Sequence, residues 1–145
     1  MKKIIFLLGS LLCFVSAETT FIKGFSTLSV EEVSTKLQDI LKSKGLRIFG
    51  VFEHSKLAKE ANLSMQDTIV VAFGAPKAGT PLMQCAPEIA LELPLKILIY
   101  KDKDGKTNIL YRDIKDIAKD YNVDCKEVLD GLSKAQASFF EAITD

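Results

Sequence analysis

The chain has 145 residues, enough for one domain with a hydrophobic core, and its 48% hydrophobic and 26% charged residues are typical of a soluble globular protein. Basic and acidic residues balance at 19 each, so no basic excess favours nucleic acid as a partner. Composition therefore excludes a strongly basic nucleic-acid-binding protein, and any function has to be inferred from local patterns.

The N-terminus up to Ala17 is predicted to be a secretory signal peptide. Lys2 and Lys3 precede an apolar run that ends at Val15, and small residues follow at the positions that a signal peptidase reads. The run is shorter than the roughly 20 residues that span a bilayer. We expect cleavage after Ala17, a periplasmic or secreted location, a single mature domain over residues 18–145 and no membrane span in that domain. An uncleaved membrane anchor is the alternative.

The first elements of the mature chain are predicted to be a strand, a helix and a second strand. Loose alternation marks a strand over residues 19–27. A helix follows over residues 29–44, where Ser29 and Glu32 have the spacing of a capping box and apolar residues recur on one face. Residues 46–54 alternate as a strand, and a short helix is expected directly after it.

The second half of the chain is predicted to hold three more strands and three more helices. Pro81 suits the first turn of a helix capped by Thr80, and Asp104-Gly105 is a hairpin turn signal. Gly131, inside the last helix, would be explained by a close helix contact. The strands are expected over residues 69–73, 95–100 and 107–112, and the helices over 80–86, 113–121 and 124–143.

This order of elements predicts an α+β fold, a mostly antiparallel sheet with helices packed on one face. Only the hairpin pairing is dictated by a short turn, but each helix has a single apolar stripe, as one-sided packing requires. The residues expected in the core are Leu37, Ile48, Phe52, Val71, Ile97, Ile99, Leu129 and Phe139.

Three short motifs carry a resemblance to a known family. They read Phe73-Gly74-Ala75-Pro76, then Gly79-Thr80-Pro81-Leu82-Met83, then Leu93-Pro94-Leu95. With His54 before an alanine-bearing helix, they resemble the bacterial domain of unknown function 302 family (DUF302) over about residues 46–121. Ala75 and Cys85 depart from residues that are common at those positions. The resemblance implies a TATA-binding-protein-like fold, β-α-β4-α, without DNA binding and often dimeric. It implies no activity, because the family has none established.

The glycine-rich segment after Phe73 has two readings. It lacks a lysine directly before Thr80, and this disfavours a nucleotide-hydrolase phosphate loop. Free N–H groups at a helix start near Thr80, beside Lys77, would attract an anion. The alternative is a tight structural turn in which Gly74 and Gly79 supply unusual dihedrals.

His54, the only histidine, could be structural, contact a ligand or act as an acid or base. One histidine cannot build a multi-histidine zinc site, so we assign no metal. Met83 is more typical of a core, although with His54 it could form an axial pair for haem iron. Cys85 and Cys125 could pair in an oxidising compartment or remain two buried thiols.

These residues predict an exported module that binds a small, anionic ligand. The ligand-binding residues would be His54, Lys77, Gly79, Thr80 and Met83, lining one pocket, with the cofactor left open. Two alternatives remain: an enzyme that uses His54 as acid or base, and a purely structural module that forms homodimers.

Overall fold

The computed structural model describes residues 20–145, and the predicted signal peptide lies outside the described residues. Most of the elements have bounds within a few residues of those expected from sequence. In chain order they are β1 (Ile22–Ser26), α1 (Val30–Ser43), β2 (Arg47–Glu53), α2 (His54–Glu60), β3 (Thr68–Gly74), α3 (Pro76–Cys85), the 3-10 helix η1 (Pro87–Leu91), β4 (Leu95–Lys101), β5 (Thr107–Tyr111), α4 (Ile114–Lys119) and α5 (Lys126–Ile143).

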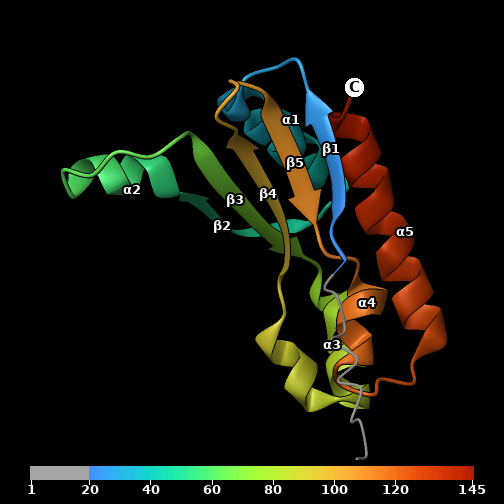
Figure 1. Ribbon diagram of the computed structural model, residues 1–145. Helices are drawn as coiled ribbons and strands as arrows, with labels where there is room; N and C mark the ends of the chain where they lie inside the picture. Colours follow the sequence, from blue (N-terminus) through green and yellow to red (C-terminus); the bar gives the residue numbers. More distant parts are fainter. Residues whose placement is uncertain (1–19) are drawn as a thin grey trace, which may run out of the picture.

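The five strands form one antiparallel sheet in the order β1-β5-β4-β3-β2. Helices α1 and α5 cover one face of this sheet, and within residues 20–145 no helix covers the middle of the other face (Figure 1). The framework is a strand, a helix, four strands and a helix, with α2, α3, η1 and α4 inserted. The α+β fold class predicted from sequence is confirmed.

Helix α1 forms where local signals predict it. The Ser29 hydroxyl accepts a hydrogen bond from the Glu32 main-chain N–H, and the Glu32 carboxylate accepts one from the Ser29 N–H at 2.8 Å. Gly45 ends the helix with φ of +72°. The apolar face, including Leu37, packs on the sheet residues Val71, Ile97 and Ile99, all fully buried.

Phe52 is a correction to the expected core. A β-bulge between Ile48 and Gly50 inserts one residue into β2. Ile48 then pairs with Phe73 on the covered face, whereas Phe52 pairs with Val70 on the open face and is 47% exposed. The bulge moves each later side chain of β2 to the opposite face of the sheet. A prediction based on strict alternation of side chains does not include such a shift.

Helix α3 begins one turn earlier than predicted. Pro76 stands at its first position, and the main-chain N–H groups of Ala78 and Gly79 both donate to the Ala75 carbonyl. Pro81 therefore lies inside the helix, where it removes one backbone hydrogen bond, and Thr80 is not the cap. The supposed loop is helical, so Gly79 needs no unusual dihedral angle.

Candidate functional site

His54 lies far from the other predicted site residues. It is the exposed first residue of α2, and its ring stacks on Phe52 with the centroids 6.5 Å apart. Antiparallel pairing of Glu53 with Ile69 puts His54 beside the start of β3, whereas α3 follows the end of β3. The seven residues of β3 span about 20 Å. The single pocket expected around His54 is therefore wrong, and so is the haem pair with Met83.

Gly79 and Met83 do meet, in an apolar pocket of about 220 Å³ that we call the α3 hollow. The twelve lining residues within the described part of the chain are all apolar or glycine. They come from β2, the end of β3, α3, η1, the start of β4 and α5. Besides Gly79 and Met83 they are Phe49, residues 73–76, Ala90, residues 93–95 and Leu132.

The three family-like motifs converge on this hollow. Every residue of the first motif (73–76) and of the third (93–95) lines it, together with Gly79 and Met83 of the second. A Cβ atom on Gly79 would lie 3.8 Å from a Leu93 methyl carbon, an ordinary contact, so a larger side chain there would extend into the hollow. The motifs thus build most of one concave apolar surface.

Lys77 and Thr80 do not line the α3 hollow. Lys77 lines a neighbouring interhelical hollow of about 440 Å³ between α3 and α5, with Lys44 and Glu127 also on its walls. Thr80 is exposed and lines neither hollow. The expectation of free N–H groups near Thr80 is also wrong. The helix starts at Pro76, and the main-chain amides just before Thr80 already donate to the Ala75 carbonyl.

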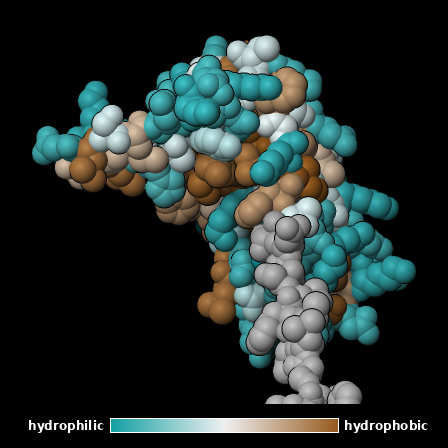
Figure 2. Space-filling view, in the orientation of Figure 1, coloured by the Kyte–Doolittle hydropathy of each residue, from teal (hydrophilic) through white to brown (hydrophobic). Residues whose placement is uncertain are grey.

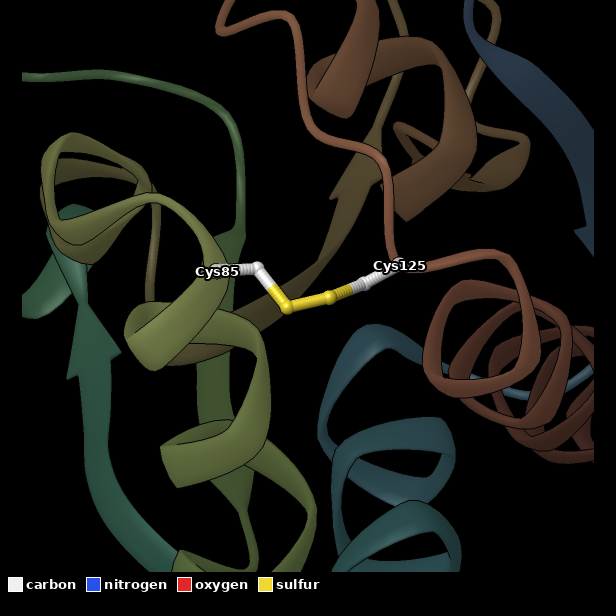
Figure 3. Close-up of a disulfide and its surroundings, with 2 residues drawn as sticks. All are labelled: Cys85 and Cys125. Carbon is white, nitrogen blue, oxygen red and sulfur yellow. A yellow bond between two sulfur atoms is a disulfide. The ribbon is translucent and has the colours of Figure 1, made fainter.

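Cys85 and Cys125 form a disulfide, which settles the alternative left open by the sequence (Figure 3). The bond joins the last residue of α3 to the residue that precedes α5, with the Cα atoms 6.5 Å apart. It therefore holds together the two helices that wall the interhelical hollow. Because both sulfur atoms are bonded, neither cysteine supplies a thiol for a cysteine–histidine pair.

Phe49, Ala90 and Leu132 are the described lining residues that the sequence did not point to. Phe49 is the residue of the β2 bulge, 52% exposed, and the Arg47 guanidinium lies 5.8 Å from its ring centroid. Gly50, a glycine inside a strand pattern, is a weak sequence signal for the bulge beside it. Across residues 20–145, no three His, Cys, Asp or Glu side chains are grouped so that they could hold a metal ion.

Comparison with known proteins gives a family and a fold. The model of the family described as "Domain of unknown function DUF302" matches residues 23–139. The solved structure "Crystal structure of uncharacterized conserved protein DUF302 from Bacillus stearothermophilus" is similar with a TM-score of 0.75, covering 85% of this chain and 97% of that chain. At 17% identity this similarity concerns the fold alone.

Two curated relatives are named "Fluoride-specific ion channel FluC 1", from Brucella suis biovar 1 (strain 1330) and Brucella abortus biovar 1 (strain 9-941). Each is 36% identical over 85 residues, which are 59% of this chain but only 34% and 32% of those proteins. This chain thus matches about a third of their length. None of the helices described for residues 20–145 is long and apolar enough to cross a membrane.

Proposed function

This chain belongs to the DUF302 family, and we propose that it is an exported module that holds a small, mainly apolar ligand in the α3 hollow. The observation that carries the proposal is the convergence of all three family-like motifs on that one pocket. Small-molecule sites are concave and mostly apolar, and none of the described residues on the walls here is charged. The ligand class differs from the anionic one expected from Lys77 and Thr80, which lie outside this pocket.

Rigid support around the hollow favours binding over a merely structural turn. One wall is α3, which the Cys85–Cys125 disulfide ties to α5, and another is the start of the central strand β4. Phe49, half-exposed at the rim, would be covered when a ligand packs against it. A preformed pocket keeps the ordering cost of binding small.

The experiment is to fill the hollow and compare ligand content. The protein is purified from its own host and examined by native mass spectrometry. Gly79→Leu should abolish any copurifying small molecule, because the added side chain extends into the pocket. Gln84→Leu, on the exposed side of the same helix, is the matched control and should retain the ligand. Equal ligand content in both variants would contradict the proposal.

Export is a second part of the proposal. The predicted signal peptide motivates it, and the disulfide supports it, because structural disulfides persist in oxidising compartments. The intact mass of the mature protein should begin at Glu18 and include one disulfide. Met1 retained on the exported protein, or two free thiols, would contradict this part.

A homodimer is the interaction that the surface favours. Helix α2 and its flanking turns (residues 54–67) form an arm that extends away from the sheet, and no residue of α2 is buried (Figure 1). The arm and its base expose large apolar side chains, namely Phe52, Leu57, Leu63 and Met65. We propose that a second copy covers them.

Analytical ultracentrifugation tests the homodimer. The double change Leu57→Asp and Leu63→Asp should give a monomer at concentrations where the unchanged chain is a dimer. Leu91→Asp is the control, because Leu91 is 81% exposed but lies on η1, away from the arm. A dimer that survives the double change would exclude the arm as the interface.

Use of His54 as a catalytic acid or base has less support. The side chain is exposed and stacked on Phe52, and the disulfide occupies both described cysteines. His54→Ala should therefore leave ligand content unchanged. Loss of a measured turnover in a folded His54→Ala variant would favour the enzyme instead.

A second candidate function is that of an accessory domain for an ion channel. The names of the curated relatives carry this candidate, because the segment shared with this chain is about a third of proteins named fluoride-specific ion channels. On this proposal the domain docks on a separate channel and assists its conduction of fluoride. Deletion of the gene should then lower the host's fluoride tolerance, and unchanged tolerance would count against it.

A further inference from the structure

A different hollow opens on the sheet face that α1 and α5 leave uncovered. Register places Phe52, Val70, Leu98 and Leu110 in one row across four strands of this face. Figure 2 looks onto the face and shows hydrophobic residues gathered over the middle strands, between hydrophilic margins. A pocket of about 330 Å³ is lined by the last three residues of the row and by Arg112; we call it the Arg112 hollow.

Arg112, on the wall of this hollow, has one side-chain donor without a partner within residues 20–145. Its Nη2 donates to Asp120 Oδ2 at 2.6 Å, and its main-chain carbonyl accepts from Gln136 Nε2 at 3.2 Å. Its Nε atom is buried and has no hydrogen-bond partner among the described residues. Folded proteins rarely leave a buried donor of a charged group unsatisfied. The bond to Asp120 holds the guanidinium in place, so Nε is a fixed donor for an acceptor oxygen.

The charges on the walls favour an anion over a cation. Arg112 and Lys96 line the hollow against one acidic residue, Glu92. The Glu92 carboxylate accepts the Tyr121 hydroxyl at 2.8 Å, and the Lys96 amine donates to the Glu92 main-chain carbonyl. Asp120 neutralises part of the Arg112 charge but is itself not on the walls.

We infer that the Arg112 hollow binds small organic acids with an apolar body. A carboxylate oxygen accepts a hydrogen bond from Arg112 Nε, which satisfies the buried donor, and Lys96 adds positive potential. The apolar body packs against Val70, Leu98 and Leu110. This site shares only Leu95 with the α3 hollow, and the inference does not depend on the function proposed there.

Three probes of equal chain length test the inference on the unchanged protein. Hexanoate, 1-hexanol and hexylammonium are titrated while backbone amide signals are followed by NMR. Hexanoate should bind about tenfold more tightly than hexylammonium, with hexanol between them, because charge-assisted hydrogen bonds are the stronger ones. Signals of Val70, Leu98 and Leu110 should shift. Equal binding of hexylammonium, or shifts confined to residues around Gly79, would overturn the inference.

Arg112→Lys isolates the contribution of the buried Nε–H. Lysine keeps the positive charge and can still pair with Asp120, but it has no donor at that position. Affinity for hexanoate should fall about tenfold, whereas affinity for hexanol should change little. Asp120→Asn leaves the Nε–H donor of Arg112 in place and should not weaken hexanoate binding. Full hexanoate affinity in Arg112→Lys would overturn the assignment; should that variant not fold, the order of the three probes on the unchanged protein decides.

Discussion

Gly24 of β1 lies directly beneath Phe140 of α5. A Cβ atom on Gly24 would stand 2.7 Å from Phe140 Cζ and 2.6 Å from Thr144 Cγ2, closer than such atoms approach. Gly24→Ala should therefore push the end of α5 off the sheet edge and lower the free energy of unfolding by about 1–3 kcal/mol, as overpacking does. Urea unfolding measures this, and an unchanged midpoint would show that α5 adjusts without cost.

Gly131 of α5 gives the opposite prediction. The close contact expected from its place inside a helix is absent, because a Cβ atom there would have nothing within 4 Å. Gly131→Ala should raise the free energy of unfolding by up to about 1 kcal/mol, since alanine is the better helix former. The same urea series measures it, and a fall in stability would contradict the open surroundings of this residue.

Elements with local signals were predictable from sequence. The Ser29–Glu32 capping box and Gly45 bound α1, and Asp104-Gly105 marks the β4–β5 hairpin, because each of these signals acts within a few residues. Gly79 and Met83 lie four residues apart on α3 and so share one of its faces, but the sequence placed Gly79 before a helix over 80–86 and did not predict this.

Features set by tertiary pairing were not predictable. The bulge at Phe49 reverses the facing of Phe52, and antiparallel pairing of β2 with β3 carries His54 to the far end of the sheet from α3. The distance between Cys85 and Cys125 depends on how α3 meets α5, across 40 residues of sequence. Apart from the weak signal of Gly50 beside the bulge, a single chain carries no local signal for these relationships.

Removal of the disulfide should destabilise the fold measurably. The Cys85→Ser, Cys125→Ser double variant loses a cross-link between residues 40 apart, which should cost about 2–4 kcal/mol by loop entropy. A reducing agent should lower the thermal midpoint of the unchanged protein to that of the double variant. It should leave the thermal midpoint of the double variant unaffected. If reduction does not alter the thermal midpoint of the unchanged protein, the bond is not stabilising.

Two apolar residues on opposite faces of the sheet test the register. Ile97 is fully buried on the sheet face that α1 covers, whereas Phe52 is 47% exposed on the open face. Ile97→Ala should cost about 2–5 kcal/mol, as large-to-small core changes do. Phe52→Ala should cost about 1 kcal/mol or less. Equal losses of unfolding free energy would place both residues in the core and contradict the bulge.

The side-chain carboxylate of Asp145 links the segment after α5 to the end of β1 and makes the stability of the fold depend on pH. Asp145 accepts the Thr27 main-chain N–H at 2.5 Å and the Ser26 hydroxyl at 3.3 Å. Hydrogen bonds from Thr27, then from Ser26, hold the pKa of Asp145 below its ordinary value of 3.8. A carboxyl whose pKa is lower in the folded state stabilises the fold above its unfolded pKa. That stabilisation is lost as the pH falls from about 4 through the folded-state pKa.

Asp145→Asn should therefore lower the free energy of unfolding at pH 7 and flatten its decline below pH 4, where the unchanged protein loses the same interaction. Urea unfolding at pH 7, 4 and about 2.5 measures both effects. Asp39→Asn is the matched control, because Asp39 is an exposed residue of α1 whose side chain makes no hydrogen bond or ion pair within residues 20–145. If the two variants show the same pH profile of unfolding free energy, the contact between Asp145 and Thr27 does not contribute to acid sensitivity.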